Sequence, residues 1–379
     1  MKIMHLSDLH IGKRVNEFSM IEDQRYILSQ ILAITDAERP EAVIIAGDIY
    51  DKPLPSAESV VLFDDFVCSL ASRELEVMII SGNHDSAERM SFGSRLMNRS
   101  GIHISNVYNG SVQRVVLDRD GLGPLNFYLL PFIKPAHVRA AFPDAEIQTY
   151  TDAVRKAVSE MKIDESERNI LVTHQFVTGA SRSESEEISV GGSDNVDACV
   201  FEAFDYTALG HLHGPQDAGS SRIRYSGSPL KYSFSEKDQI KSVTMVEMGK
   251  KGDVSVSTVP LTPMHDLREI RGTYDELTDR RNYAGTAADD YLRVVLTDEE
   301  DIPDALAKLR TIYPNIMKLE YDNTRTRTSP DLRELEERQA ESPYDLIARL
   351  YELQNGRTMD EDQSQLAHKL IEDIWEAGS

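Results

Sequence analysis

Short apolar runs that end in polar side chains recur along the first 213 residues of the chain. Five of them, at residues 2–7, 42–47, 77–81, 170–173 and 206–210, are rich in Val, Ile and Leu. Continuous apolar runs of this length are typical of strands buried on both faces. Stretches of helical periodicity at 20–39 and 56–73 separate the first three runs. Strands that alternate with helices predict an α/β domain.

Each predicted strand leads into residues that commonly bind metal ions. The five motifs are Asp8-Leu9-His10, Gly47-Asp48, Gly82-Asn83-His84-Asp85, Thr173-His174 and Gly210-His211-Leu212-His213. Sites in α/β sheets form outside the carboxyl ends of the strands, so the motifs are expected to meet at one edge.

The residue types point to borderline divalent metals. Carboxylate, imidazole and amide ligands together suit manganese, zinc or iron, whereas a calcium site would contain oxygen ligands only. Thiolate ligands are not expected, since the two cysteines, Cys68 and Cys199, lie far from the motifs in sequence. In an extended segment, side chains two apart point to one side, which would pair Asp8 with His10 and bring His211 and His213 together.

Two metals about 3.5–4 Å apart would activate a water and clamp the oxygens of an in-line displacement at phosphorus. Such a pair needs a shared ligand, and Asp48 is the natural bridge.

Simpler interpretations exist for each motif taken alone. Asp8 or Asp48 could cap a helix, and Asn83 could merely adopt a left-handed turn. A single histidine after a strand is usually a surface or hydrogen-bonded residue. These interpretations become improbable jointly, because every predicted strand end offers a ligand.

Several stretches resemble the calcineurin-like metallophosphoesterase superfamily and, within it, the SbcD family of nuclease subunits. They are MKIMHLSDLHIGK, AGDIYDKPLPS, SGNHDS, LGHLHGPQ and YSGSPLKYSFSE. The resemblance is strong over about residues 1–265 and weaker to the end. It implies a two-sheet sandwich flanked by helices, with a small α+β capping domain and a helical C-terminal tail. It also implies a double-strand DNA exonuclease and single-strand endonuclease, the nuclease subunit of a DNA repair and recombination complex.

The resemblance further implies a ligand set for two ions, expected to be Mn(II). One ion would be held by Asp8, His10, Asp48 and His213, and the other by Asp48, Asn83, His174 and His211. His84 would contact the scissile phosphate and stabilise or protonate the leaving oxygen; alternatively, it orients a metal ligand. Asp85 is expected to hold its loop. Some relatives carry a further histidine where this chain has Asp51, to which no role is assigned.

Basic residues near the motifs are candidates for DNA contacts, although each alone is more often a solvated charge. They are Lys13, Arg14, Arg89, Arg182 and Lys231. His103, His137, His265 and His368 have no motif around them and are interpreted as ordinary surface or core residues.

The charge balance opposes simple DNA binding. Lys and Arg number 41 against 64 Asp and Glu, a formal net charge of −23, and a DNA-binding protein normally presents a basic face. The expectation is therefore that DNA binding is shared with a partner or within a homodimer. Residues near 62–66 and 89–96 are a possible dimer interface.

Four segments are predicted: a nuclease domain at 1–263, a capping domain at 264–323, a polar linker at 324–329 and a helical segment at 330–379. The capping domain should have strands at 267–271, 291–296 and 316–321, with a helix at 302–312. Leu346, Ile347, Leu350 and Leu353 form an apolar stripe, and a second helix is expected at 359–377. These helices either pack on the capping domain or dock on an SbcC-type coiled-coil ATPase.

Two cysteines, no signal peptide and no long apolar segment together predict a cytoplasmic protein. The chain shows no P-loop motif, which assigns ATP hydrolysis to the partner. Two rival functions stay open at this stage: a small-molecule or nucleotide phosphodiesterase of the same fold, and a noncatalytic DNA-end tether.

Overall fold

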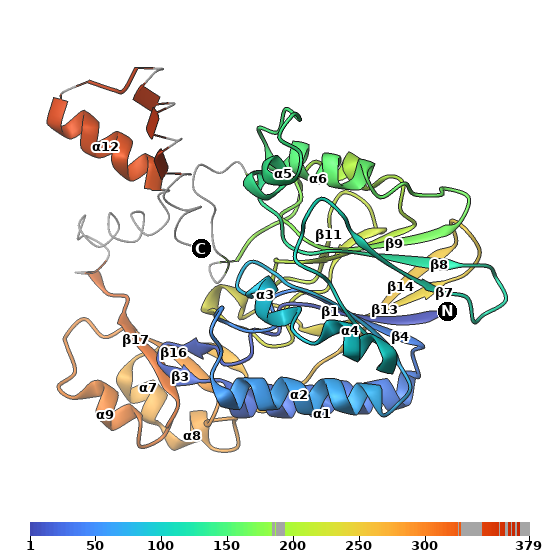
Figure 1. Cartoon of the computed structure of the whole chain (residues 1–379). Coiled ribbons are helices and arrows are strands. Elements are labelled where there is room, and N and C mark those ends of the chain that lie inside the picture. Colours follow the sequence, from blue (N-terminus) through green and yellow to red (C-terminus); the bar gives the residue numbers. More distant parts are fainter. Residues whose placement is uncertain are drawn as a thin grey trace.

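The computed structural model describes residues 1–183, 186, 194–324, 326, 343–355, 357–360, 363, 364, 366, 367, 370 and 371. Two six-stranded sheets stack face to face, and helices cover both outer faces (Figure 1). This is the metallophosphoesterase sandwich that the resemblance implies.

The first sheet has the order β14-β13-β1-β4-β5-β6. Its strands are β1 (Lys2–Leu6), β4 (Ala42–Ala46), β5 (Glu76–Ile80), β6 (Ile102–Ile104), β13 (Ser242–Met248) and β14 (Val254–Pro260). β1, β4, β5 and β6 run parallel, so their carboxyl ends meet at one edge.

The second sheet has the order β11-β12-β10-β9-β8-β7. Its strands are β7 (Gln113–Leu117), β8 (Leu125–Leu130), β9 (Arg168–His174), β10 (Tyr206–Gly210), β11 (Gln216–Asp217) and β12 (Ile223–Tyr225). All six residues of β8 are buried, but this strand was not predicted because no ligand motif follows it.

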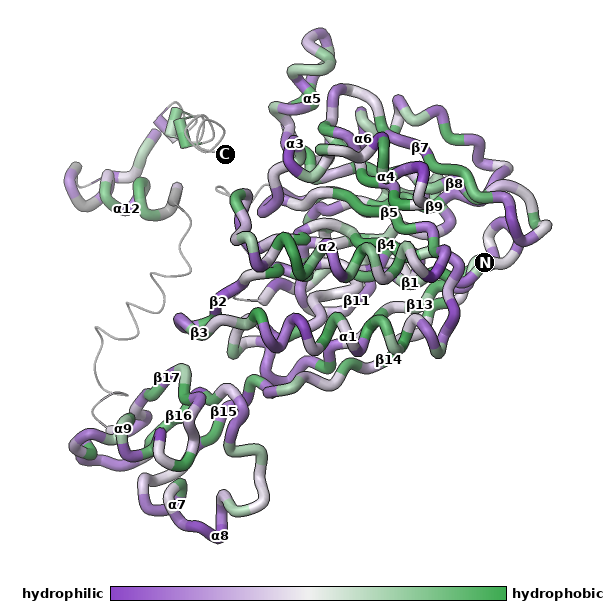
Figure 2. The backbone as a smooth tube through the Cα atoms, turned by 60° about the horizontal axis from the view of Figure 1, so that its bottom comes forward, coloured by the Kyte–Doolittle hydropathy of each residue, from purple (hydrophilic) through white to green (hydrophobic). Residues whose placement is uncertain are grey.

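Apolar side chains fill three layers. One core cluster, which includes Ile44 and Phe127, lies between the sheets. A second packs the first sheet against α1 (Ile21–Glu38) and α2 (Ala57–Ala71), and a third packs the second sheet against α5 (Pro135–Ala141) and α6 (Tyr150–Ser159). Central strands are therefore buried on both faces, while apolar and polar residues alternate along α2 (Figure 2).

The five strands and two helices expected around the motifs are confirmed, with ends that differ by at most two residues. α2 begins after Ser56, whose side chain accepts a hydrogen bond from the Ser59 amide. Short elements fill the remaining loops: β2 (Arg14–Val15), β3 (Phe18–Ser19), α3 (Ala87–Met90) and α4 (Ser94–Met97).

Beyond Pro260 the chain forms a separate three-stranded sheet of β15 (Leu267–Gly272), β16 (Tyr291–Leu296) and β17 (Ile316–Tyr321). All three strands run parallel, and they pack with α7 (Tyr274–Thr278), α8 (Arg280–Tyr283) and α9 (Ala305–Leu309) around their own core. The helix predicted at 302–312 is wrong in its bounds, because Asp304 has a φ of 55° and ends the preceding turn in a left-handed conformation.

A buried carboxylate joins this small unit to the sandwich. Asp23 on α1 accepts hydrogen bonds from the Tyr291 hydroxyl at 2.7 Å and, at 3.0 Å, from His265 Nδ1. His265 therefore has a structural role at the junction.

α12 (Pro343–Asn355) forms where the first tail helix is predicted and lies apart from the sandwich in Figure 1. Its residues Leu346, Ile347 and Leu350 are 46%, 41% and 55% exposed. Most of the second predicted helix, with Ile374 and Trp375, lies outside the described residues, as do His368 and four of the six predicted linker residues. No helix within the described ranges is long and apolar enough to span a membrane.

Candidate metal centre

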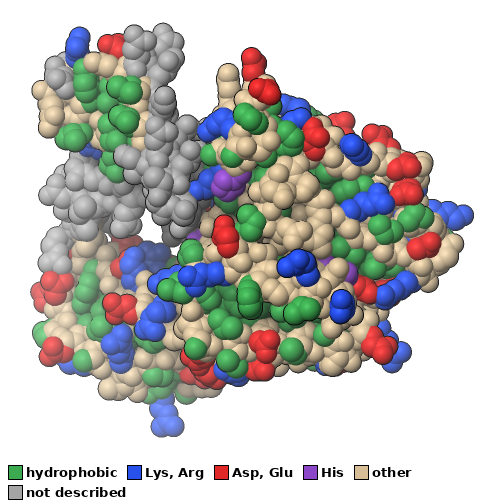
Figure 3. All heavy atoms as spheres, in the orientation of Figure 1, with side chains coloured by type: hydrophobic (Ala, Val, Ile, Leu, Met, Phe, Trp, Pro, Cys, Tyr) green, Lys and Arg blue, Asp and Glu red, His purple; other side chains and the backbone are tan. Residues whose placement is uncertain are grey.

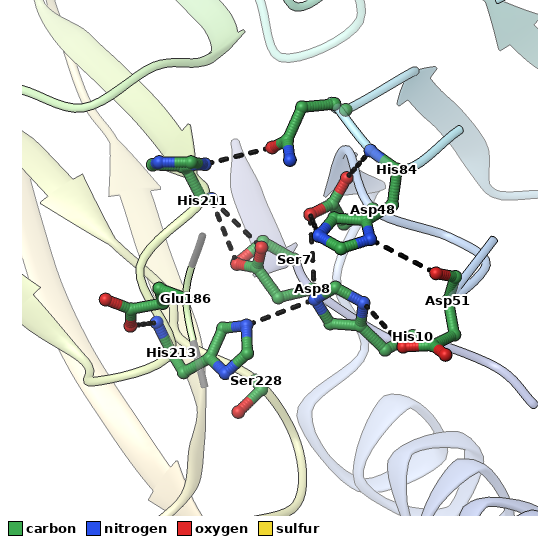
Figure 4. A network of polar contacts seen from close by, with 12 residues as sticks. Ser7, Asp8, His10, Asp48, Asp51, His84, Glu186, His211, His213 and Ser228 are labelled. Atoms are coloured by element: carbon green, nitrogen blue, oxygen red, sulfur yellow. Dashed lines mark hydrogen bonds and ion pairs between the residues drawn. The ribbon is translucent and has the colours of Figure 1, made fainter. Parts of the chain in front are cut away.

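The carboxyl ends of β1, β4, β5, β9 and β10 bring the five motifs together. Figure 4 shows labelled residues from four of them. Asp8, His10 and His213 form one cluster, here named the His213 group, whose ligand atoms lie within 4.8 Å of one another. His10 Nε2 is 3.1 Å from His213 Nε2, and all three side chains are at most 2% exposed.

A second cluster, the Asn83 group, contains Asn83, His174 and His211. Asn83 Oδ1 lies 3.0 Å from His174 Nε2 and 3.0 Å from His211 Nδ1. His174 Nδ1 is 2.9 Å from the Ala46 carbonyl, to which it donates, leaving Nε2 with a lone pair for a ligand.

Asp48 stands between the two groups. Its Oδ2 is 3.6 Å from His10 Nε2 and 3.3 Å from His174 Nε2. Two ligand atoms bound at about 2.1 Å and at right angles to each other are about 3 Å apart, so these spacings match those around divalent ions. The residues present therefore fit two metals with one carboxylate in common.

The loops that present the ligands adopt an unusual backbone. Asp8, His10, Asp48 and His211 have φ angles of 52°, 44°, 50° and 104°. Positive φ in non-glycine residues costs about 1–3 kcal/mol and concentrates at functional sites. The expectation of an extended Asp8–His10 segment is thus wrong, since left-handed turns aim these two side chains.

The pairing of His211 with His213 is also wrong. His213 belongs with His10, whereas His211 faces Asn83. The His211 amide donates to the Asp8 carboxylate at 3.0 Å, which links the two groups through the backbone.

Two glycines permit the close approach of these loops. A Cβ on Gly82 would lie 2.0 Å from Asp48 Oδ1, and one on Gly210 would lie 1.9 Å from the Ala46 carbonyl oxygen. No side chain can occupy either position unless the loop moves.

Gln24, on α1, holds the loop of His10. Its side-chain amide donates to the His10 carbonyl at 2.7 Å, and its Oε1 accepts from the Gly12 amide at 2.9 Å. Gln24 lies on a helix outside every motif, so no sequence pattern indicated its role.

A buried ion pair supports His213 and was likewise missed. Glu236 Oε1 lies 3.5 Å from His213 Nδ1, and Glu236 Oε2 lies 2.5 Å from Lys241 Nζ. Lys241 is 5% exposed, and its ammonium also donates to the His213 carbonyl at 2.8 Å. Carboxylates that bind the outer nitrogen of a ligand histidine fix its orientation. Both charged residues lie in a polar stretch of sequence, which gave no sign of their burial.

Two further carboxylates hold backbone near the site. Asp85 accepts from the amides of Ile49, Tyr50 and Gly82, which confirms that it fixes its loop. Glu186, which no motif contains, is buried and accepts from the His213 amide at 2.5 Å.

His84 lies beside the ligands, with its side chain 16% exposed. Its Nδ1 is 3.1 Å from the Asp51 carbonyl, and its Nε2 is 4.0 Å from Asp48 Oδ2. The backbone carbonyl of Asp51 therefore orients His84. The Asp51 side chain accepts a hydrogen bond from Lys13 Nζ at 2.7 Å.

Burial shifts the pKa values of the predicted ligands, upward for a carboxylate and downward for imidazoles. It raises the pKa of Asp8 to about 6 and lowers the pKa values of His10 and His211 well below the usual range. Burial alone would lower the pKa of His174, but the Asp48 carboxylate outweighs it and raises this pKa to about 9. Without metal, one proton is thus held between His174 and Asp48.

The basic residues predicted near DNA fall into two kinds. Lys13, Arg182 and Lys231 form ion pairs with Asp51, Asp194 and Asp266. Arg14 donates to the Glu17 carbonyl, and Arg89 makes no side-chain ion pair or hydrogen bond within the described part of the chain. Of these five residues, only Arg14 and Arg89 keep uncompensated charge near the site.

Comparison with known proteins agrees with this geometry. Residues 1–215 match the family model of calcineurin-like phosphoesterases, and residues 263–355 match one described as the type 5 capsule protein repressor C-terminal domain. The SbcD subunit of the SbcCD nuclease of Staphylococcus epidermidis is 35% identical over 323 residues, covering 84% of this chain and 85% of that protein. The chain belongs to the SbcD family of calcineurin-like phosphoesterases. Another SbcD relative, from Staphylococcus saprophyticus, is 32% identical over 383 residues and 100% of each chain.

Among solved structures, a dimetal phosphatase from Danio rerio is 10% identical and covers 70% of this chain and 98% of that one. Its TM-score of 0.36 is too low to support any argument about function. Membership of the SbcD family confirms the expected fold class and the expectation of a metal-dependent, phosphoester-hydrolysing enzyme.

Proposed function

We propose that this protein is a two-metal phosphodiesterase acting on DNA, the nuclease subunit of an ATPase-coupled complex that processes DNA ends in repair and recombination. One observation supports it most directly: Asp48 Oδ2 lies within 3.6 Å of a ligand nitrogen from each group. A single oxygen placed between two ligand clusters is what a metal pair requires.

In this proposal Asp8, His10, Asp48 and His213 hold one ion, and Asp48, Asn83, His174 and His211 hold the other. The two ions, proposed to be Mn(II), would activate a water and neutralise charge at phosphorus when bound. The chain's own residues orient these ligands, exclude solvent from the His213 group and position the substrate.

His84 is proposed as the catalytic side chain. Its Nδ1 is occupied by the Asp51 carbonyl, which directs Nε2 toward the space beside Asp48. Because Nδ1 donates to that carbonyl, Nε2 carries a proton only when the ring is an imidazolium. In that form Nε2 would donate a hydrogen bond or a proton to the oxygen that leaves phosphorus. The alternative, that His84 orients Asp48, predicts loss of metal on mutation.

The deciding experiment compares wild type with His84→Ala on end-labelled duplex DNA and on circular single strands, with Mn(II), with and without an SbcC-type partner. Wild type should degrade duplex from its ends and nick the circle. The variant should lose cutting by about 10²–10⁴-fold while still binding two metals. Inactivity of wild type on both DNAs, alongside turnover of a small phosphodiester, would favour the small-molecule rival. A metal-loaded protein that bridges DNA ends without cutting either substrate would favour the tether.

The tail is proposed to dock on the ATPase through residues 330–379. Support comes from the stripe of Leu346, Ile347 and Leu350, apolar side chains that are 41–55% exposed. Deletion of 330–379 should abolish binding to the coiled-coil partner and spare Mn(II)-dependent activity on a small phosphodiester. Leu346→Asp/Leu350→Asp should reproduce this loss and Glu352→Ala should not; retention of binding by the truncated chain would exclude the docking site.

A second copy of the chain is proposed to dock on the surface of α2, α3 and α4. Apolar side chains gather on this face in Figure 3, and a groove of about 590 Å³ runs between Leu54, Val60 and Phe92. Phe92 is 85% exposed and Leu96 71%, whereas Leu62 and Phe66 of the predicted interface face the core.

Sedimentation equilibrium tests this dimer. Phe92→Asp should convert a dimer to a monomer, because it places a charge in the apolar groove. Leu122→Asp, at an exposed apolar residue outside the groove, is the control and should stay dimeric. A wild-type monomer, or a dimer that Phe92→Asp leaves intact, would exclude this interface.

The division into segments 1–263, 264–323, 324–329 and 330–379 is also proposed, supported by the separate core of the small unit. Arg14 is retained as a DNA contact, whereas Arg89 lines the groove proposed for the second copy and is assigned to that interface. A cytoplasmic location is proposed from the low cysteine content.

A further inference from the structure

A second polar pocket lies away from the ligands, between α4, β6 and β7. It encloses about 330 Å³. Its polar lining includes Arg95, Asn98, His103, Asn106, Gln113 and Arg114. None of these residues belongs to the His213 or Asn83 group.

The position of the pocket follows from the topology. β6 is the outer strand of the first sheet and β7 is the outer strand of the second, so the pocket bridges the open edges of both. Ile104, the last residue of β6, pairs with Ile79 on β5, the strand that leads to Asn83. The pocket therefore lies at the same edge of the sheet as the metal centre, one strand further out.

The pocket is positively charged, although the chain as a whole is acidic. Arg95 and Arg114 make no ion pair or side-chain hydrogen bond with any described residue, whereas Arg73, Arg168 and Arg224 each pair with a carboxylate. No Asp or Glu is among the described residues that line the pocket. Both arginines are exposed to solvent and line the pocket, so in a protein of net charge −23 their guanidinium groups are free to bind an anion there.

His103 forms the inner wall. It is 9% exposed, and its Nε2 lies 2.7 Å from Glu76 Oε2, which fixes the ring. Its Nδ1 is buried without a hydrogen-bond partner among the described residues. Because this nitrogen is itself buried, it is not open to the pocket, and His103 contributes a rigid wall and no anion-binding donor.

We propose that this pocket binds the phosphate group of a nucleotide unit, either in a free nucleotide or in a DNA strand. Guanidinium groups form paired hydrogen bonds with phosphate oxygens, and Asn98, Asn106 and Gln113 add amide donors. The volume accommodates a phosphate with part of its sugar. The inference is independent of the metal chemistry, because it can be tested with the metals removed.

The test uses the full-length protein in a chelator, so that phosphate cannot bind through metal ions. Inorganic phosphate, deoxyadenosine monophosphate and a short single-stranded oligonucleotide are titrated separately by calorimetry. Wild type is compared with Arg95→Gln/Arg114→Gln and with the matched control Arg99→Gln. Arg99 is also exposed on the segment after α4 but does not line the pocket.

The double variant should bind at least one of the three probes about tenfold or more weakly than wild type, and Arg99→Gln should not. Loss for phosphate and the mononucleotide would identify a free-nucleotide site. Loss confined to the oligonucleotide, with a shallower salt dependence, would identify a contact to the DNA backbone. Arg95→Lys/Arg114→Lys, which keeps charge without the planar fork, should restore part of the affinity. If the double variant and Arg99→Gln match wild type with every probe, the proposal is overturned.

Discussion

The His213 group and the Asn83 group use similar ligands but are built differently. Buried side chains from distant segments fix the first: Gln24 holds the His10 loop, and Glu236 with Lys241 holds His213. Backbone fixes the second, through the Ala46 carbonyl on His174 and the close approach of Gly82 to Asp48. The two groups therefore depend on different parts of the fold. Mutations that weaken metal binding at one group should differ from those that weaken it at the other, although the ligand types are similar.

The largest effect should come from the residue that both groups share. Asp48→Asn removes the charged oxygen between them and should lower phosphodiesterase activity by about 10³-fold or more, since each ion contributes several kcal/mol. Metal analysis should find fewer than two ions per chain. Asp36→Asn, which removes a surface ion pair with Arg73, is the control and should keep both ions. Two tightly bound ions in Asp48→Asn would refute the bridging role.

Gly82→Ala should damage the Asn83 group first. The new Cβ would clash with Asp48 Oδ1 and displace the loop, and a displacement of about 1 Å can cost about 10²-fold in rate. Gly272→Ala, where the nearest atom is a flexible Glu276 oxygen at 3.1 Å, should be close to neutral. Activity assays and thermal unfolding of both variants make the comparison; equal effects would mean that the close approach does not matter.

Lys241→Met should damage the His213 group alone. Glu236 would lose its counter-ion, and the support of His213 would weaken, with metal affinity falling about 10–100-fold. Titration should then resolve one weakened and one unchanged site. Lys251→Met, at the more exposed pair with Asp205, serves as the matched control. Equal weakening of both sites would contradict the separate supports.

The smallest effect is a difference in proton linkage. Metal at the Asn83 group must displace the proton of His174, whose pKa is about 9, so affinity there should rise about tenfold per pH unit from 7 to 9. At the His213 group the Asp8 pKa is about 6, so affinity should fall only below about pH 6. Calorimetry in buffers of different ionisation enthalpy would measure the protons released. Identical pH profiles for the two sites would exclude this assignment.

Local sequence patterns predicted much of this protein. The apolar runs before Asp8, Asp48, Asn83, His174 and His211 identified the ligand-bearing strands, because a buried parallel strand needs little more than a short Val- and Ile-rich stretch. Residue chemistry at the ends of these runs then predicted one polar site. β8 was not predicted, because no motif follows it. The parallel order of β15, β16 and β17 was not predicted either, because it depends on contacts between strands that local patterns do not indicate.

The sequence by itself determined which residues could bind metal and that strand ends would bring them to one edge. Tertiary structure alone decided how they divide, with His211 and His213 in different groups and Asp48 between them. It also decided the left-handed turns at Asp8 and His10 and the burial of Lys241. The physical reason is that residue type and periodicity are local, whereas turn conformation and burial are set by packing between segments far apart in the chain.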